Sequence, residues 1–375
     1  MSHIRSLLTV AVCAGVLGMS IVGQAVANPR ARAGNEAVRA NDGIVSVISG
    51  TPGGTYFRMA SDLSMVLDGQ DGIRILPIMG KGAGQNAYDI LYLKGIDIGF
   101  VRTDTIEQLK ADPKISNPTS QVVYIARLFN DELHVLAGSD VTDVSQLAGK
   151  RVSFDVAGSG SDFSGRAMFK GLGIQIEAVN IDQASALEAL KRGELAAVVS
   201  VAAKPVTILQ NLPPKSSFHL LSVPFPASIS ESYMPAEIES ADYPNLVGSG
   251  DIIKTLAVGT ILAAINHPKG TERYNRLARF SEVFFNQFDD LLRAPRHPKW
   301  REVSINAVVP GWTRFQPAQA WLDRRAQEIA SREAAKHASA RADIQKFLES
   351  KMILPNTDRD QLLAEFLSWR AAKKQ

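Results

Sequence analysis

The sequence predicts an α/β protein with two lobes, built from parallel sheets that carry helices on both faces. Its 375 residues are enough for two domains of ordinary size. From Ile44 onward, short apolar runs alternate with amphipathic helical patterns, which is typical of parallel sheets. Two stretches, residues 44–67 and 151–174, also repeat one pattern of apolar strand, loop of Gly, Ser and Thr, and helix. The repeat indicates that each lobe contributes one such loop.

The alternation of patterns predicts each element in chain order. Strands are expected at Ile44–Ser49, Ile73–Met79, Ile96–Val101, Gln121–Leu128, Glu132–Ala137, Val152–Val156, Ile174–Val179, Ala196–Val201 and Thr255–Ile265. Helices are expected at Tyr56–Leu67, Gln85–Lys94, Asp104–Lys110, Asp140–Leu147, Phe163–Leu172, Ser185–Arg192, Lys204–Leu212 and Tyr274–Leu292. Residues 318–350 are rich in Ala, Arg, Glu and Lys and predict a long helix, and Asp358–Trp369 predicts a final amphipathic helix.

The N-terminus has the pattern of a cleaved export signal. A positive charge precedes an apolar run at residues 7–22, and Ala25-Val26-Ala27 fits the small-x-small cleavage pattern. We therefore expect a signal peptide at residues 1–27, cleaved after Ala27, and a flexible leader at residues 28–43. An uncleaved membrane anchor is the alternative, but the apolar run is short for a membrane span. The expected location is a bacterial periplasm.

Composition narrows the function classes. The only cysteine, Cys13, lies in the predicted signal, so we expect the mature chain to have no disulfide and no cysteine-based metal site. The six histidines show no metal-ligand spacing.

A net charge of +3 without a dense basic run argues against nucleic acid as a partner. No G-x-S-x-G motif is present. We therefore expect no catalytic residue, no metal and no cofactor, and a binding protein rather than an enzyme; a periplasmic hydrolase is an alternative.

The first Gly-rich loop, residues 50–55, has the residue types of an anion-binding helix start. Its glycines permit close backbone approach, and the helix that follows presents unpaired N–H groups and the positive end of its dipole. Thr51 and Thr55 can donate hydroxyls, and Tyr56 offers a flat apolar wall with a polar tip. A tight turn with a capping threonine is the structural alternative.

The second loop, residues 158–162, matches the first. Ser159 and Ser161, on either side of Gly160, can donate hydrogen bonds from their hydroxyls to a ligand. Two such loops can bind one small anion from opposite sides. The alternative is that Ser159 or Ser161 caps the helix that follows. The pairing of the two loops favours the binding interpretation.

Two further residues, Lys81 and Arg102, are expected to place positive charge at the cleft. Lys81 lies in a third glycine loop and can balance a carboxylate, which Asn86 can hydrogen-bond; a solvated lysine on a turn is the alternative. Arg102 follows a buried strand at its carboxyl end, where ligands bind in open α/β sheets. It can pair with a ligand carboxylate or, structurally, with Asp104.

An ordered set of motifs resembles the TAXI-type solute-binding proteins, the extracytoplasmic component of a class of TRAP transporters. The motifs cover roughly residues 44–325 and are GTPGGTYF (50–57), KGAGQNAYDILYLKGIDIGFVRTD (81–104), LHVLAG (133–138), LAGKRVSFDVAGSGSDFSGRAMFKGLGI (147–174), ALKRGELAAVVSVAAKPVTILQNL (189–212) and LAVGTILA (256–263).

The resemblance implies a two-lobed periplasmic-binding-protein fold of type II, a Venus flytrap with two crossovers at its hinge. We accordingly assign residues 44–138 plus 255–325 to the first lobe and 139–254 to the second. Residues 326–375 form a C-terminal helical extension that runs past the usual end of the family.

The resemblance also implies a function: capture of a small carboxylate, an amino acid or a dicarboxylate, and its delivery to a TRAP-type membrane permease. The alternative partner is a sensor protein that docks on the C-terminal helices. Relatives commonly carry a neutral residue where Arg102 stands, so this chain is expected to favour a more anionic ligand. The matching positions imply a ligand site at Thr51, Gly54, Thr55, Tyr56, Asn86, Thr103, Asp104, Ser159, Gly160 and Ser161.

Overall fold

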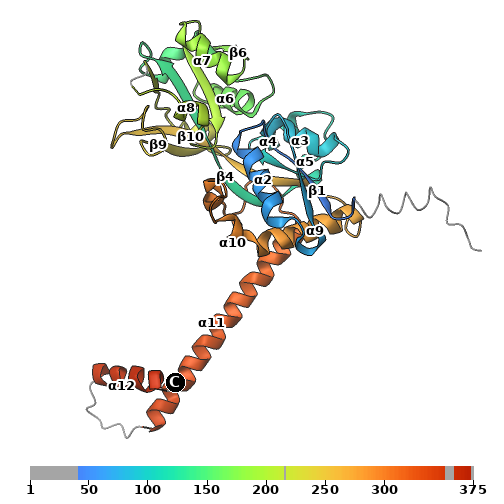
Figure 1. Ribbon diagram of the computed structural model, residues 1–375, viewed down its shortest axis with the longest axis vertical. Coiled ribbons are helices and arrows are strands. Elements are labelled where there is room, and N and C mark those ends of the chain that lie inside the picture. The colour runs from blue at the N-terminus through green and yellow to red at the C-terminus, as the bar shows by residue number, and fades with distance from the viewer. Residues whose placement is uncertain (1–40, 215–216, 351–358, 373–375) are drawn as a thin grey trace, which may run out of the picture. The chain divides into compact units, whose positions relative to one another are not determined.

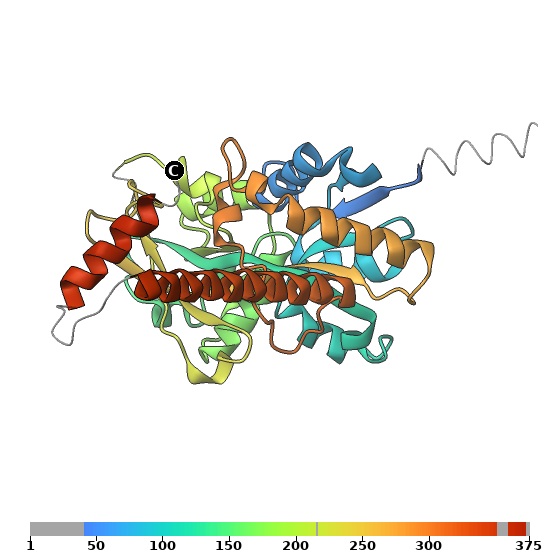
Figure 2. The ribbon, with the colours of Figure 1, turned by 90° about the horizontal axis from the view of Figure 1, so that it is seen from below.

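Figures 1 and 2 show the computed structural model, which describes residues 41–214, 217–350 and 359–372. The predicted signal peptide and residues 28–40 of the predicted leader lie outside the described residues. Residues Gly43–Gln375 belong to one compact unit, and the account below concerns that unit.

Ten strands join into one sheet among the described residues. They are β1 Ile44–Ile48, β2 Arg74–Ile78, β3 Ile98–Arg102, β4 Val122–Gly138, β5 Arg151–Ser153, β6 Glu177–Val179, β7 Ala197–Ala202, β8 Phe218–Leu220, β9 Met234–Glu239 and β10 Ile252–Ile265. Their order is β2-β1-β3-β10-β4-β7-β5-β6, with β8 paired to β4 and β9 to β10.

Helices of very different length surround this sheet. They are α2 Thr55–Leu67, α3 Ala83–Tyr92, α4 Thr105–Ala111, α5 Pro118–Gln121, α6 Gly160–Gly171, α7 Gln183–Lys191, α8 Thr207–Gln210, α9 Glu272–Asn286, α10 Phe288–Leu291, α11 Gln316–Ser350 and α12 Arg359–Ala372. Short 3-10 turns are η1 Gln70–Gly72, η2 Val144–Leu147, η3 Ala227–Ile229 and η4 Pro298–Glu302.

Two long antiparallel strands, β4 and β10, run through both halves of the sheet (Figure 1). The N-terminal part of β4 and the C-terminal part of β10 lie beside the parallel strands β1, β2 and β3. The other ends of the same two strands lie beside β7 and β9, and β7 pairs in parallel with β5. The chain therefore crosses twice between two sheet halves, as the resemblance implies.

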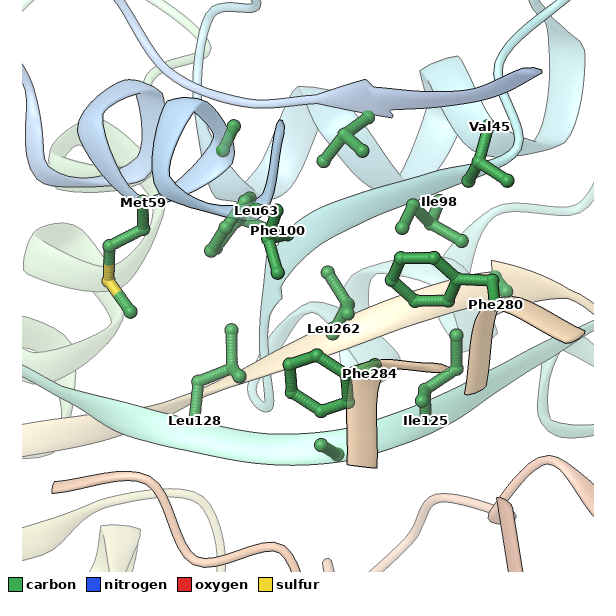
Figure 3. Packing of buried hydrophobic residues seen from close by; sticks show 14 of the residues in the cluster. Val45, Met59, Leu63, Ile98, Phe100, Ile125, Leu128, Leu262, Phe280 and Phe284 are labelled. Atoms are coloured by element: carbon green, nitrogen blue, oxygen red, sulfur yellow. The ribbon is translucent and has the colours of Figure 1, made fainter. Parts of the chain in front are cut away.

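Separate hydrophobic cores define the two lobes. In the first lobe, α2 and α9 pack on one face of the sheet and α3 and α4 on the other. Figure 3 shows Phe280 and Phe284 of α9 beside Ile125, Leu128 and Leu262 of the two long strands. The second lobe has its own cores under α6 and under α7. A two-lobed α/β fold of the periplasmic-binding-protein type II class is thus confirmed, while the residue limits of the lobes stay a prediction.

The prediction of two strands over residues 121–137 was wrong, because β4 is one strand of 17 residues. The sequence pattern breaks at the polar residues Asn130 and Asp131, which usually mark a turn. Here both side chains have partners inside the structure: Arg127 donates to Asn130, and Arg102 donates to one carboxylate oxygen of Asp131. A strand can therefore continue through them into the second lobe.

Two predicted helices are shorter than expected. Only Thr207–Gln210 is helical within the predicted helix Lys204–Leu212, because Pro205 lacks a backbone donor and disfavours helix in the residue before it. Only Val144–Leu147 is helical within Asp140–Leu147, as a 3-10 turn that a capping box of Asp143 and Gln146 closes.

The C-terminal helical extension is confirmed as α11 and α12. The first turns of α11 pack on α9, where Trp321 stacks on Phe285 with ring centroids 4.9 Å apart. Beyond that contact most described residues of α11 are exposed. Near its end, Phe347 is buried against Phe366 and Trp369 of α12. No helix among the described residues is long and apolar enough to cross a membrane.

His134 makes the stability of the second lobe depend on pH. It is buried on β4, and one ring nitrogen lies 2.8 Å from the Tyr243 hydroxyl. Burial lowers its pKa from 6.5 to about 4. Between these values the unfolded chain binds more protons than the folded one, so the contribution of His134 to stability is lost as pH falls from 6.5 to 4.

We expect His134→Gln to reduce this loss, because glutamine stays neutral and can still hydrogen-bond Tyr243. Urea denaturation of wild type and variant at pH 7.0 and 4.5 measures it. The exposed His337→Gln serves as the control and should retain the wild-type loss. An equal loss in the His134→Gln protein would contradict the assignment.

Candidate functional site

A cavity of about 500 Å³ lies at the carboxyl ends of strands from both lobes. Its first-lobe wall comes from the loops before α2 and α3 and the end of β3, and its second-lobe wall from the loops before α6 and α7 and the segment that follows β7. Of the twelve predicted site residues, nine line this cavity: Thr51, Gly54, Thr55, Tyr56, Lys81, Arg102, Ser159, Gly160 and Ser161.

The loop before α2 leaves the helix start open toward the cavity. Gly54 is the N-cap residue, and no side chain caps the helix. Gly53 has φ of +80°, a left-handed conformation that glycine adopts without strain. The first N–H groups of α2 have no partner within the helix, so this loop offers donors and a positive dipole end to a ligand.

The loop before α6 combines capping with exposure to the cavity. Ser159 accepts a hydrogen bond from the N–H of Asp162 at 3.2 Å, so it caps α6. Helix capping was the structural alternative to ligand binding for this serine. The Ser161 hydroxyl accepts from the N–H of Val201 at 3.0 Å, which ties α6 to β7. Both serines still line the cavity. Ser161 can also donate to a ligand, because its hydroxyl oxygen only accepts here, whereas the Ser159 hydroxyl donates to the Phe154 carbonyl at 3.5 Å.

Arg102 lies at the base of the cavity and is almost completely buried. Its Nε donates to Asp131 at 2.7 Å, Nη1 reaches Ser164 at 3.4 Å, and Nη2 donates to the carbonyl of Val201. The sequence left open whether Arg102 pairs with Asp104; its ion-pair partner is Asp131. A guanidinium has five N–H groups, so two remain for a ligand.

The charges around Arg102 hold it in its ionised form. Burial by itself lowers the pKa of Arg102, but Asp131, Tyr56 and Asp104 together outweigh burial and raise that pKa above its ordinary value. Tyr56 also donates its hydroxyl to Asp131 and stacks on Phe100 with ring centroids 5.3 Å apart. Burial raises the pKa of Tyr56, so its hydroxyl stays protonated.

Arg102 and Asp104 both make hydrogen bonds from the first lobe to the second. Arg102 comes from the first lobe and contacts α6 and β7 of the second. Asp104, at the start of α4, accepts from Ser164 at 2.6 Å and from the Tyr233 hydroxyl at 2.8 Å, both in the second lobe. Burial raises the pKa of Asp104. A buried polar network therefore spans the junction behind the cavity.

Three predicted site residues do not line the cavity. Asn86 is fully buried and donates to the carbonyls of Ser49 and Phe100, both at 2.8 Å, which fixes α3 against the sheet. Asp104 is buried in the network described above, and Thr103 lines a different cavity. Asn86 lies within α3, and Thr103 and Asp104 form the turn between β3 and α4, so none of the three side chains follows that of Arg102 into the cavity.

Charged groups on the cavity rim come from both lobes. Lys81 is exposed and has no ion-pair partner among the described residues. Asp155, in the second lobe, accepts from the N–H of Val156 at 2.8 Å, and burial raises its pKa. Asp155 also has φ of +66°, a conformation uncommon for a residue with a side chain.

Sequence reasoning missed several residues of the cavity. Asp131, Asp155, Gln183 and the segment 200–203 all line it. Only Asp131 could have been found from the sequence, because it is a carboxylate within an otherwise apolar stretch. Within the described part of the chain, no group of three His, Cys, Asp or Glu side chains is placed to hold a metal ion.

Solved structures with a similar chain course are all distant in sequence. The periplasmic binding protein BugD is 13% identical, with 79% of this chain and 97% of that chain covered and a TM-score of 0.45. A periplasmic transporter protein is 14% identical, with 78% and 96% covered and a TM-score of 0.44. A sulfonate-binding protein from Methylobacillus flagellatus is 13% identical, with 70% and 73% covered and a TM-score of 0.41.

No curated protein matches the sequence. A family match is present, and it covers the cavity loops together with both long strands. It extends from residue 47 to residue 267, which is more than half of the chain. The chain therefore belongs to the NMT1-like family.

Proposed function

We propose that the protein is an exported solute-binding protein that captures a small carboxylate between its two lobes and delivers it to a TRAP-type membrane permease. One observation carries the proposal: the uncapped start of α2 and the Ser159-capped start of α6, from different lobes, line one cavity together with Lys81 and Arg102. Helix starts and these two cations favour an anion from both sides. The export signal that the sequence predicts at residues 1–27 supports a periplasmic location.

The proposed ligand is an amino acid or a dicarboxylate. A ligand carboxylate would accept from the free N–H groups of Arg102 and of the α2 start, with Ser159 and Thr55 beside it. Asp155, on the opposite rim, suits the ammonium group of an amino acid. Closure of the lobes around the ligand would complete these contacts and exclude water.

Thermal shift measurements on the chain from Asn28 onward test the ligand class. We expect at least one carboxylate from a panel of amino acids and di- and tricarboxylates to raise the melting temperature, because it binds only the folded state. Its amide or ester analogue should not. Lys81→Gln should weaken the carboxylate about 3–10-fold, since an exposed charge pair contributes little more than this.

Lys94→Gln is the matched control, because Lys94 is exposed and lies outside the cavity. It should bind the carboxylate like wild type. A neutral or apolar compound that stabilises the protein when no carboxylate does would overturn the anion-binding proposal.

The C-terminal helices favour a second candidate, in which a sensor rather than a permease is the partner. Most of α11 is exposed, and Phe347 binds α12 back onto its end. Deleting residues 326–375 separates the two candidates. Carboxylate uptake that requires the protein and survives this deletion supports delivery to a permease through the lobes. A ligand-induced response that is lost with the C-terminal helices, in cells whose uptake does not require the protein, supports the sensor.

A further inference from the structure

A second cavity, of about 560 Å³, lies between the lobes and shares no lining residue with the first. Thr103, Ile106 and Arg127 line it from the first lobe, and Ser232 and Met234 line it from the second. Tyr233, which donates to Asp104 in the buried network, is also in its wall. The network therefore separates the two cavities. Nothing in the proposed function uses this second space.

Arg127 gives the second cavity an uncompensated positive charge. It lies on β4 and is partly buried. Its N–H groups donate to the carbonyl of Leu128 at 3.2 Å and to the side-chain oxygen of Asn130, both neutral. Among the described residues no carboxylate lies within ion-pair distance of it. A partly buried cation without a counter-charge attracts an anion.

The carboxylates on the rim of the second cavity do not neutralise Arg127. Glu107 is exposed and accepts from Lys110 at 2.8 Å, and Glu231 is exposed. Solvent screens such exposed charges strongly. Burial lowers the pKa of Arg127 while Glu302 and Glu132 raise it, so the guanidinium loses solvation without gaining a close partner.

The backbone leaves room beside this guanidinium. Gly259 of β10 lines the cavity, and a Cβ there would lie 3.2 Å from the Thr103 methyl group and 3.8 Å from Arg127 Nε. The remaining walls are largely apolar, from Ile106, Met234 and Val309. The cavity thus offers Arg127, the hydroxyls of Thr103 and Ser232 and an apolar part of its wall, while the second cation, Lys110, is paired with Glu107.

We propose that the second cavity is a binding site for a small organic monoanion with an apolar body, whose carboxylate pairs with Arg127. The hydroxyls of Thr103 and Ser232 fix the orientation of the carboxylate. The apolar body packs on Ile106 and Met234, which belong to different lobes. A monoanion fits because Arg127 is the one lining cation without an ion-pair partner among the described residues.

Phenylacetate and its neutral isostere phenylacetamide test the proposal by isothermal titration calorimetry on the chain from Asn28 onward. We expect saturable binding of phenylacetate at one site, at least about tenfold tighter than phenylacetamide, since a charge-assisted pair contributes this much. Arg127→Gln should weaken phenylacetate at least about tenfold. Ser232→Trp should abolish its binding by filling the cavity.

Arg314→Gln is the matched control. Arg314 is also a partly buried arginine that donates to backbone carbonyls, those of Ile125 and Ala307, but it does not line the cavity. It should bind phenylacetate within about twofold of wild type, and so should Lys81→Gln in the first cavity. Circular dichroism confirms that each variant is folded.

Three results would overturn the proposal. They are the absence of phenylacetate binding to the wild type at millimolar concentration, equal binding of acid and amide, and wild-type affinity in both Arg127→Gln and Ser232→Trp. A crystal soaked in phenylacetate supplies a further readout, because density must appear beside Arg127. Binding that Lys81→Gln removes and Arg127→Gln retains would assign phenylacetate to the first cavity instead.

Discussion

Replacing Asp131 by asparagine is expected to lower the free energy of unfolding by about 3–5 kcal/mol, the usual cost of leaving a buried charge without its partner. Asp131 is 1% exposed and Arg102 is 4% exposed. The substitution keeps the shape of the side chain but removes the charge that accepts from Arg102 and Tyr56. Arg102 would keep only the neutral partners Val201 and Ser164.

Urea denaturation with a double-mutant cycle measures this pair. Arg102→Gln combined with Asp131→Asn should be less destabilised than the sum of the single variants, because the double variant removes both members of the ion pair and leaves neither without the other. The surface pair of Asp290 and Arg293 is the matched control, and Asp290→Asn should change stability little. Strict additivity of the two buried substitutions would contradict the ion pair.

Replacing Gly160 by alanine is expected to lower the free energy of unfolding by about 2–4 kcal/mol, within the range of a disrupted buried network. Gly160 begins α6, and a Cβ there would clash with the Arg102 guanidinium, lying 2.7 Å from its Cζ. Arg102 would have to leave Asp131 and Val201. Because Gly160 and Arg102 come from different lobes, the substitution should also weaken capture of the carboxylate.

Gly84→Ala is the control for the alanine substitution itself. Gly84 lies in α3 near the cavity, and a Cβ there would meet its nearest atom, on Gln108, at 3.4 Å. It should change stability by less than about 1 kcal/mol, the ordinary helix effect of such a change. In an Arg102→Gln background, Gly160→Ala should cost much less than in the wild type. A full cost there would show that Arg102 is not what the methyl group meets.

The sequence was sufficient to predict the fold because the patterns that define it are local. Alternating apolar runs and helical patterns identified β1, β3 and β7 within one or two residues, and the composition after Pro317 predicted α11. Residues such as Asp131 depend on tertiary partners instead. No residue near Asp131 in the chain indicates that Arg102 and Tyr56 will be its partners. The sequence therefore predicted two strands where the structure has the single strand β4.

Some residues of the candidate site could likewise be predicted from local sequence, and others depend on tertiary structure. The loops before α2 and α6 could be found because Gly, Ser and Thr at a helix start have a meaning that does not depend on distant parts of the chain. Asp155 and Gln183 line the cavity only because β5, β6 and β7 are adjacent in the second lobe. Thr103 follows Arg102 directly but lines the other cavity, since it belongs to the turn between β3 and α4.

The contacts of Arg102 and Asp104 across the lobes have a kinetic consequence. They hold the lobes together through the protein's own side chains, so we expect a solute to enter mainly when the lobes part and these contacts break. Entry would then be limited by the frequency of that opening rather than by diffusion, which gives slower association than electrostatic steering allows. The same contacts would prolong the residence time of a captured solute. A faster exchange of solute in the Asp131→Asn protein, seen by stopped flow, would be the signature of such a gate.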